Sequence, residues 1–373
     1  MKARRVLITG GAGFVGSHTA DALVTAGHEV RIFDNLTSQV HQGGMNSYIP
    51  REAEFILGDV RNLAQMRKAV AAQDVIFHFA AAVGVGQSMY QIADYTATNN
   101  LGTANLLQAI LDTRSFPEKI VVASSMSLYG EGKYVCPAGD EVAPTARPLD
   151  QLKAKQWETL CPNCHATLIP VPTPEDKPLE CTSIYALSKK DQEEMTLLFG
   201  RTYGIPVVAL WYFNIYGPRQ SLSNPYTGVA AIFASRMLNG KAPIIFEDGE
   251  QMRDFVSIHD IARANLRALE SPGADGRALN IGSGNPVSIG EVARALGRAL
   301  GTHLPAEITG KYRAGDVRHC FANIRAANHL LTYSPRTSLE QGMGELACWL
   351  KSQQAEDQVD LALAQLNVHG LVA

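Results

Sequence analysis

The stretch "RRVLITGGAGFVGSH" (residues 4–18) decides the fold. "RRVLIT" (4–9) is the apolar run of a buried β-strand, and Gly10, Gly13 and Gly16 follow it before a helical pattern predicted over 17–27. A glycine turn of this kind lets backbone N–H groups and a helix N-terminus approach a pyrophosphate. A strand–helix turn without a ligand is the simpler alternative. The stretch therefore predicts either a dinucleotide site or a plain turn at the first strand of an α/β sheet.

Asp34 favours the dinucleotide. It ends the second predicted strand, 18 positions after Gly16, where a carboxylate accepts hydrogen bonds from the adenosine ribose. A carboxylate there would repel a 2′-phosphate, which favours NAD over NADP. Asp59 in "GDVRN" is placed to meet the adenine amine, although an ordinary turn aspartate has the same pattern.

Apolar runs alternate with helical patterns over the first 210 residues or so, which predicts an α/β, Rossmann-type doubly wound parallel sheet. A helix is expected over 99–112. We assign 1–213 to this domain, with an irregular inserted lid at about 131–180 and a returning segment at about 255–283. Residues 214–254 and 284–350 are expected to form a smaller, irregular C-terminal substrate-binding cap, and 351–373 a helical tail.

Composition excludes several classes of protein. Lys plus Arg number 33 against 36 Asp plus Glu, so no basic field indicates nucleic acid or an anionic membrane as partner. No apolar run of about 18 residues predicts a membrane span, and no secretory leader is visible. The six cysteines are therefore expected to be reduced thiols or metal ligands in a cytoplasmic protein.

"SIYALSKK" (183–190) places Tyr185 and Lys189 on one helix face. Such a pair is common on solvated helices, so the spacing alone is weak. A phenol with a pKa near 10 is a poor base at neutral pH, and a nearby ammonium would favour the phenolate. The two residues could therefore form an acid/base pair.

The ordered set "TGGAGFVG", Asp34, "GDV", "FHFAA", "SSMSLYG", Tyr185-x-x-x-Lys189 and "FNIYGPRQ" resembles the extended short-chain dehydrogenases/reductases. Within them the chain is most similar to NAD-dependent nucleotide-sugar epimerases and dehydratases of the UDP-galactose 4-epimerase type, and above all to dTDP-L-rhamnose 4-epimerases. The resemblance implies tightly bound NAD, a nucleotide-sugar substrate and a homodimer formed through a helix pair. It implies Ser125, Tyr185 and Lys189 as catalytic residues. The implied cofactor contacts are Gly10, Gly13, Phe14, Val15, Gly16, Asp34, Asn35, Asp59, Val60, Ala80, Ala81, Asn99, Ser124, Tyr185, Lys189 and Tyr212.

The resemblance also implies substrate contacts. Ser127 is a second candidate sugar contact, and Tyr212 and Asn214 resemble residues that touch nicotinamide and sugar diphosphate. Arg253 and Arg313 resemble an arginine clamp on the diphosphate, with Asp316 on the nucleoside ribose. Arginine suits phosphate because its planar fork binds two oxygens. Asn224 is a further candidate, whereas Arg318 and His319 are weaker ones. His78 is expected to be a packed strand histidine and His259 a residue at a helix start.

The residues Ser125, Met126 and Ser127 discriminate within the family. Dehydratases resemble Thr-Asp-Glu at these positions, and UDP-glucuronate decarboxylases resemble Thr-x-Glu. Without the acid pair, oxidation to a 4-keto sugar and reduction from the other face remain, which predicts a 4-epimerase acting on a dTDP-6-deoxyhexose, UDP-hexose or UDP-hexuronate. A dehydratase, a ketoreductase and a non-catalytic dinucleotide-binding redox sensor are the alternatives.

The lid carries an additional cysteine pattern. Cys136, Cys161 and Cys164 in "CPNCH", and Cys181 could bind a structural zinc ion tetrahedrally. His165 competes with Cys181 for the fourth ligand position, and reduced, partly buried thiols are the alternative. Cys320 and Cys348 are expected in the core.

Overall fold

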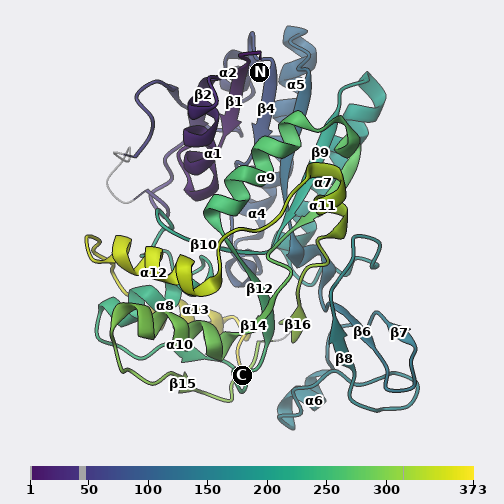
Figure 1. Cartoon of the computed structure of the whole chain (residues 1–373), viewed down its shortest axis with the longest axis vertical. Helices are drawn as coiled ribbons and strands as arrows, with labels where there is room; N and C mark the ends of the chain where they lie inside the picture. The colour runs from purple at the N-terminus through teal and green to yellow at the C-terminus, as the bar shows by residue number, and fades with distance from the viewer. Residues whose placement is uncertain (1, 42–47, 314) are drawn as a thin grey trace.

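The computed structural model describes residues 2–41, 48–313 and 315–373. Its centre is a seven-stranded sheet in which all neighbouring strands are parallel (Figure 1). In spatial order the strands are β13 (Arg277–Ile281), β9 (Val207–Tyr212), β5 (Lys119–Ser125), β4 (Val75–His78), β1 (Arg5–Thr9), β2 (Glu29–Asp34) and β3 (Glu54–Leu57). The prediction of a Rossmann-type sheet is confirmed.

Helices cover both faces of this sheet, because both faces are apolar. On one face lie α1 (Phe14–Thr25), α9 (Ile258–Glu270) and α11 (Arg325–Leu331). On the other face lie α2 (Leu63–Val70), α5 (Gly102–Thr113) and α7 (Ile184–Tyr203). Between β4 and α5 the chain forms α3 (Val85–Ser88), α4 (Ile92–Tyr95) and the π-helical turn η1 (Thr96–Leu101). Two short 3₁₀ turns, η2 (Met126–Tyr129) and η3 (Pro272–Ala274), follow β5 and α9.

The glycine turn leads into α1 three residues earlier than the apolar pattern predicts. Gly13 is the N-cap, so the helix begins at Phe14. Gly10 has φ +68°, which favours glycine, and a Cβ on Gly16 would overlap the Gly10 carbonyl oxygen. The first and third glycines are therefore required by the turn itself.

The cap has its own sheet and core. β10 (Asn214–Tyr216), β12 (Met252–Ser257), β14 (Pro286–Ser288) and β16 (His319–Cys320) form one sheet, and β11 (Ile244–Ile245) pairs with β15 (Glu307–Ile308). Three helices contribute to the core: α8 (Val229–Leu238), α10 (Ile289–Leu300) and α12 (Leu339–Leu350). The chain returns from β12 to the central layer through α9 and β13 (Figure 1). Our exact domain boundaries stay a prediction.

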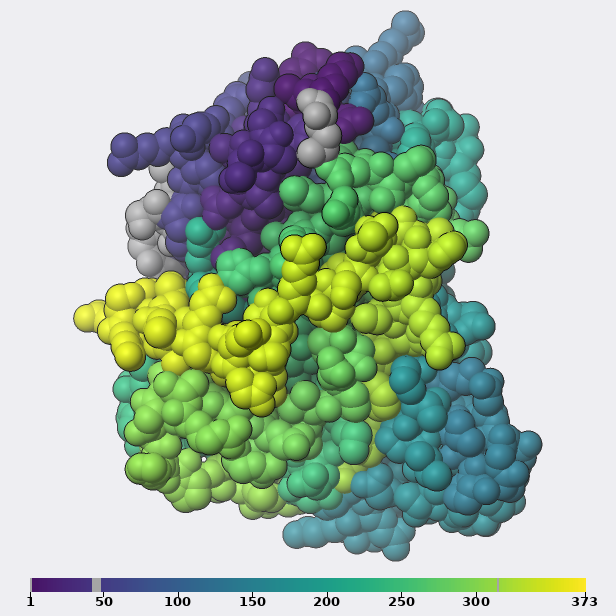
Figure 2. Space-filling model, in the orientation of Figure 1, coloured from purple at the N-terminus to yellow at the C-terminus, as the bar shows by residue number. Residues whose placement is uncertain are grey.

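The lid is a small separate lobe beside the cap (Figures 1 and 2). It contains the antiparallel strands β6 (Lys133–Val135), β7 (Glu141–Val142) and β8 (Ile169–Val171), together with α6 (Leu149–Lys153). Its strands are too short for a clear periodicity in the sequence. Four buried residues form its own apolar core: Tyr134, Cys136, Cys161 and Leu168.

A buried ionic network joins the lid to the cap. The Arg318 guanidinium, only 1% exposed, pairs with Glu158 of the lid at 2.6 Å, with Asp248 at 2.6 Å and with Glu247 at 3.1 Å. Arg147 of the lid pairs with the same Glu247 at 2.8 Å and donates to the Asp316 carbonyl at 3.1 Å. The lid therefore contacts the loop that carries the predicted ribose ligand.

The tail contains α13 (Val359–Val368) and continues to a short bridge between Val372 and Arg313. In the described ranges, no helix combines the length and the apolar character needed to cross a membrane.

Candidate active site

The three predicted catalytic residues meet at the end of a central strand. Ser125 is the last residue of β5, and Tyr185 and Lys189 lie in the first turns of α7, which packs on that strand. The side chain of Ser183 caps the start of α7 by accepting a hydrogen bond from the Ala186 N–H at 3.1 Å. The Ser125 hydroxyl and the Tyr185 phenol hydrogen-bond each other. The structure therefore assembles the predicted set.

Burial acts against the charged forms of this pair. It raises the pKa of the Tyr185 phenol above its usual value, and the Ser125 hydrogen bond opposes this only in part. Burial also lowers the pKa of the Lys189 ammonium to about 7, although the nearby Glu193 acts in the opposite direction. Without a further positive charge, the protein groups do not favour a phenolate.

Gln192, which our sequence reasoning missed, holds Lys189 in place. Its side-chain oxygen accepts a hydrogen bond of 2.6 Å from the Lys189 ammonium. The Gln192 amide nitrogen lies 3.2 Å from His78 Nε2 and 3.3 Å from the Ala80 carbonyl. Its spacing of seven residues from Tyr185 places it on the same face of α7, which is the signal that could have revealed it.

His78 is fully buried on β4, as expected for a packed histidine. Its Nδ1 lies 2.7 Å from the Thr9 hydroxyl, and its Nε2 lies 2.9 Å from the Thr103 hydroxyl. Burial lowers its pKa to about 3, with a smaller contribution from Lys189. A neutral imidazole therefore connects β1, β4 and α5 to Gln192.

Asn99 lies in the π-helical turn η1, an irregularity that is frequent at functional sites. Its side chain accepts from the Ala82 N–H at 2.7 Å and donates to Ser188 Oγ on α7 at 2.8 Å. Asn99 thus fixes the loop after β4, which contains the predicted cofactor contacts Ala80 and Ala81, against the helix of Tyr185.

Gly10, Gly13 and Gly16 surround the N-terminus of α1, and this cradle is open. The nearest atom to a Cβ placed on Gly13 is the Gly10 carbonyl oxygen at 3.3 Å. Phe14 and Val15 form the first turn and are partly buried. Backbone N–H groups without intrahelical partners and a helix N-terminus are what a pyrophosphate requires. The cradle therefore fits a dinucleotide.

Asp34 ends β2 beside the cradle, and Asp59 lies two residues after the end of the neighbouring β3. The Asp34 carboxylate accepts from the backbone N–H groups of Ala12 at 3.0 Å and Leu36 at 2.9 Å, which orients it at the turn. Asn35 donates to Asp59 at 3.1 Å. Asp59 also accepts from Arg61, and this hydrogen bond lowers the pKa of Asp59 to about 2. Both predicted contacts thus lie near one edge of the sheet, where β2 and β3 end.

The remaining predicted cofactor residues lie at the carboxyl ends of the strands. Val60 and Ser124 are buried there. Tyr212 at the end of β9 is also buried, and its hydroxyl donates to Asn265 of α9 at 2.6 Å. In this structure the Tyr212 phenol therefore links the sheet to α9.

Two arginines flank Asp316 in the cap. Arg313 pairs with the carboxylate at 3.0 Å, and Arg253 lies 3.5 Å from it. Arg253 also donates to the Arg318 carbonyl at 3.0 Å, and Arg313 lies over the Phe246 ring at 4.9 Å. Burial opposes ionisation of Asp316, but the neighbouring arginines outweigh it and lower the pKa. The predicted clamp and ribose ligand thus form one cluster.

The other predicted substrate residues differ in their surroundings. Ser127 donates to Ser125 Oγ at 2.9 Å. Asn224 accepts from Gln39 and from the Tyr226 N–H, both at 3.1 Å. The buried side-chain oxygen of Asn214 accepts no hydrogen bond from the described part of the chain. An unpartnered buried amide oxygen is costly, so Asn214 is the candidate most in need of a ligand.

The tail connects both domains near these residues. Gln365 of α13 accepts from Tyr226 at 2.6 Å and from Tyr90 at 3.1 Å, and His369 stacks on Tyr90 at 4.5 Å. Ala373 exchanges backbone hydrogen bonds with Tyr312, beside Arg313. The tail thus extends from the α3–α4 segment to the arginine cluster.

Comparison with known proteins agrees with this geometry. The pattern of the NAD-dependent epimerase/dehydratase family matches residues 6–153 and 163–282, which is more than half of the chain. This chain belongs to that family. It is 33% identical to the dTDP-L-rhamnose 4-epimerase of Burkholderia thailandensis, over 94% of this chain and 96% of the relative. It is also 33% identical to a putative UDP-glucose 4-epimerase of Methanocaldococcus jannaschii, over 93% and 98%. A UDP-N-acetyl-α-D-glucosaminuronate decarboxylase of Bacillus cytotoxicus is 30% identical, over 93% and 98%.

Solved structures of epimerases share the fold. The UDP-glucose 4-epimerase of Thermotoga maritima with UDP-glucose has a TM-score of 0.76 and 29% identity, covering 93% of this chain and 98% of its own. The Thermus thermophilus UDP-glucose 4-epimerase complex with NAD has a TM-score of 0.73 and 27% identity, covering 94% and 100%. In this epimerase/dehydratase family member, the glycine cradle with Asp34 is the candidate dinucleotide site.

The cysteines only partly follow the prediction. Cys136, Cys161 and Cys164 place their sulfur atoms within 4.8 Å of one another. Cys181 lies outside this cluster, with its sulfur 3.9 Å from the Leu128 carbonyl, so a site of four cysteines is wrong. It packs in the apolar cluster below η2, because residue 181 already belongs to the chain leading into α7. Cys320 is buried as expected, whereas Cys348 is exposed on α12, which corrects our assignment of Cys348 to the core.

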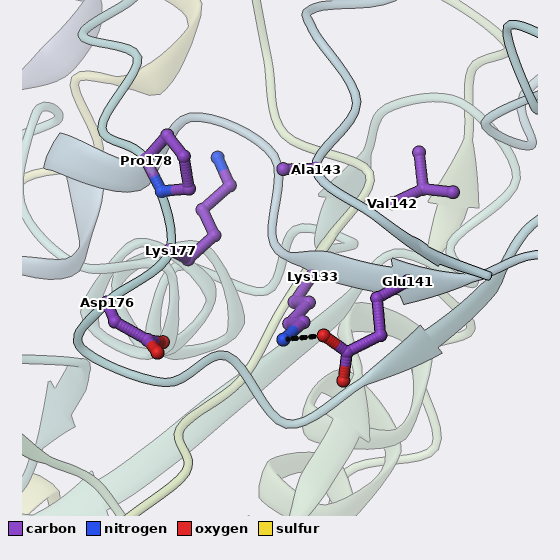
Figure 3. A pocket seen from close by; sticks show the side chains of 7 residues that line it. All are labelled: Lys133, Glu141, Val142, Ala143, Asp176, Lys177 and Pro178. Carbon is purple, nitrogen blue, oxygen red and sulfur yellow. Dashed lines mark ion pairs between the residues drawn. The ribbon is translucent and has the colours of Figure 1, made fainter.

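A cavity of about 210 Å³ lies in the lid and not beside Tyr185 (Figure 3). The ion pair between Lys133 and Glu141, 2.6 Å long, forms part of its wall. Lys177 donates to the Tyr129 carbonyl at 2.6 Å, and burial lowers its pKa. None of the predicted catalytic residues lines this cavity.

Proposed function

We propose that this chain is an NAD-dependent nucleoside-diphosphate-sugar 4-epimerase that inverts C4 through a transient 4-keto sugar. The observation that carries the proposal is the site around Ser125. It combines the hydrogen-bonded Ser125 and Tyr185 with Lys189, and the two positions after Ser125 hold Met126 and Ser127. This set can move one proton at a carbinol oxygen but offers no acid pair for elimination.

The chain's own residues would act as follows. Tyr185 takes the proton from the C4 hydroxyl as the C–H bond breaks, and Ser125 donates a hydrogen bond to the same oxygen. Gly10, Gly13, Gly16 and Asp34 would hold NAD, which when bound would supply the hydride acceptor and donor for C4 and a positive charge that favours the phenolate. On the return step Tyr185 gives its proton back to the C4 oxygen. Lys189, positioned by Gln192, adds positive charge when its amine is protonated, which at neutral pH is only part of the time because its pKa is about 7.

The alternatives need groups that this site does not offer. Met126 has a thioether without an ionisable proton, so it cannot serve as an acid, and it packs against the apolar cluster that contains Leu128 and Tyr129. The Ser127 hydroxyl, bound to Ser125, does not ionise at neutral pH. These positions argue against a dehydratase or a decarboxylase. Asp34 favours NAD, which argues against an NADPH-dependent ketoreductase. A redox sensor would not need Tyr185.

The cap supports a nucleoside diphosphate as the recognised part of the substrate. Arg253 and Arg313 could each offer a charge-assisted hydrogen bond to phosphate oxygens, and Asp316 could accept from ribose hydroxyls. Since the three side chains now pair with one another, the substrate would replace part of the arginine–aspartate contacts. Asn214 could meet the sugar or diphosphate through its unpartnered oxygen. A dTDP-6-deoxyhexose is our first choice, with UDP-hexoses and UDP-hexuronates next.

Incubation of the purified chain with these nucleotide sugars, followed by proton NMR, tests the proposal. We expect an equilibrium mixture of the two C4 epimers without added NAD, because NAD should copurify and return to its starting state in each cycle. Accumulation of a 4-keto-6-deoxy sugar would instead show a dehydratase, and loss of the carboxylate carbon a decarboxylase. Activity that depends strictly on added NADPH would show a ketoreductase.

We also propose a homodimer formed through a helix pair, as the family resemblance implies. Leu187 and Leu198, 48% and 57% exposed, are 11 residues apart on α7 and therefore share one face. Leu101 on the neighbouring η1 is 49% exposed. Analytical ultracentrifugation should give twice the chain mass of 40.3 kDa, and Leu198→Glu should shift the equilibrium to monomer. A wild-type monomer would contradict this. The cytoplasmic location stays a prediction.

A further inference from the structure

The lid brings three cysteines together by folding two short loops face to face. The loop "CPAGD" (136–140) joins β6 to β7, and the loop "CPNCHA" (161–166) joins Leu160 to Thr167, which form an isolated antiparallel bridge. The sulfur atoms of Cys136 and Cys164 are 3.4 Å apart, and all three sulfurs lie within 4.8 Å of one another. All three cysteines are free thiols.

The backbone of both loops is arranged around the sulfur of its first cysteine. The N–H groups of Asn163 and Cys164 point to the Cys161 sulfur, and the N–H group of Ala138 points to the Cys136 sulfur. Two independent loops thus bring their sulfur atoms toward the same point.

The spacing of the sulfurs suits a small thiophilic cation. With Zn–S bonds of about 2.3 Å and tetrahedral angles, two sulfurs bound to one zinc ion lie about 3.8 Å apart. The upper limit of 4.8 Å for all three pairs and the 3.4 Å between Cys136 and Cys164 bracket this value. No histidine, cysteine or carboxylate in the described ranges adds a fourth ligand atom to the group.

We propose that Cys136, Cys161 and Cys164 bind one Zn²⁺ ion through three thiolates, with the fourth coordination position open to solvent. The two loops explain why only three ligands are present. Cys136 N–H bonds to the Asp140 carbonyl at 2.8 Å, enclosing three residues, whereas Cys161 N–H bonds to the Ala166 carbonyl at 2.8 Å, enclosing four. The loop that begins at Cys136 is therefore one residue shorter than the loop that begins at Cys161. It has no residue that corresponds to Cys164, so it supplies one cysteine and not two.

A metal at this point would stabilise a lobe with little apolar core of its own. Two of the four residues in that core are the buried ligands Cys136 and Cys161. Small lobes of this kind often depend on a structural metal. Glu158, three positions before Cys161, binds Arg318 and His319, so the site also supports the contact between lid and cap.

Zinc content of the full-length chain tests the proposal without any substrate. The chain is expressed with zinc, dialysed under reductant and analysed by mass spectrometry for metals. We expect about one zinc ion per chain. Cys164→Ser is the decisive variant, because Cys164 is exposed and its loss leaves the core intact. It should lose most of the zinc, whereas the matched controls Cys181→Ser and Cys348→Ser should retain it.

Three results would overturn the proposal: wild-type protein with almost no zinc, equal loss of zinc in Cys181→Ser, or a disulfide among the three cysteines, detected by thiol titration of the chain denatured without reductant. Titration with Cd²⁺ gives a second readout, since its thiolate absorption band should fall in Cys164→Ser and not in Cys181→Ser. Insertion of a cysteine between Ala138 and Gly139 would make the two loops equal in length. This variant should release zinc to EDTA more slowly than wild type, and equal or faster release would show that the fourth position is not open as described.

Discussion

Lys189→Met should stabilise the protein when no dinucleotide is bound. The ammonium is buried, and burial lowers its pKa from 10.5 to about 7. Because the pKa is lower by about 3.5 in the folded state, the buried charge destabilises the folded protein by about 5 kcal/mol at low pH. Methionine removes this cost but leaves the Gln192 oxygen without the 2.6 Å hydrogen bond, which costs about 1–3 kcal/mol. We expect a net gain of about 2–4 kcal/mol near pH 6.

The pH dependence separates this effect from packing. Between pH of about 7 and 10.5 the unfolded chain keeps the Lys189 proton and the folded chain has lost it, so wild-type stability rises with pH by about 1.4 kcal/mol per unit. The advantage of Lys189→Met should therefore shrink by about 3 kcal/mol between pH of about 7 and 9.5, and stay constant below pH 7. Urea unfolding of dinucleotide-free protein measures it.

Lys190→Met is the matched control, because Lys190 is the next residue on α7 and its side chain is 35% exposed beside Glu194. Its effect on the free energy of unfolding should not change over the same range of pH. The difference in the free energy of unfolding between Lys189→Met and wild type could also stay constant from about pH 7 to about 9.5. That result would refute the assignment of Lys189 as a buried, largely neutral amine above pH 7.

The other expectations concern turnover and cofactor retention. Tyr185→Phe should lower kcat by about 10²–10⁴-fold with nucleotide-sugar binding largely kept, measured by NMR rates and calorimetry, and Ser125→Ala should do less. Near-normal inversion by Tyr185→Phe would exclude its acid/base role. Asp34→Ala should copurify with less NAD, measured in the supernatant of denatured protein, and unchanged content would contradict its ribose contact. Gln192→Leu should slow turnover and shift the pH profile of turnover, because Lys189 loses its hydrogen-bond partner. An unchanged profile would show that Gln192 contributes only to packing.

The central sheet could be predicted because its signals are local. The strands β1, β4, β5 and β9 are mostly apolar runs, and Gly10 and Gly16 stand where the backbone cannot accept a side chain. "KIVVASS" (119–125) agrees with β5 to the residue. Ser125 and Tyr185 could be paired only through the family resemblance, since they lie 60 positions apart with the lid between them.

The parts that escaped prediction depend on contacts between distant segments. Gln192 meets His78 and Ala80, more than a hundred positions earlier, and no pattern within α7 specifies that meeting. The lid strands have two or three residues each, which is too short for an alternating pattern. Cys181 follows the C-x-x-C pair closely enough to suggest a fourth ligand, but the chain between them forms β8 and leads away from the cluster.

The electrostatics of the site connect the cofactor to the proposed chemistry. In the protein alone, burial raises the pKa of Tyr185 and brings the pKa of Lys189 to about 7, so the phenol is protonated at neutral pH and the amine is partly neutral. Tyr185 becomes a base only when another positive charge lies beside the phenol. The oxidised nicotinamide of a dinucleotide held by the glycine cradle would supply that charge. Loss of that charge would return Tyr185 toward its protonated form, which is the form needed to protonate the C4 oxygen. Tyr185 can therefore act as the base in one half-reaction and as the acid in the other, without a second titrating residue. This agrees with the presence of Met126 and Ser127 at the positions where an enzyme that eliminates water would need carboxylates.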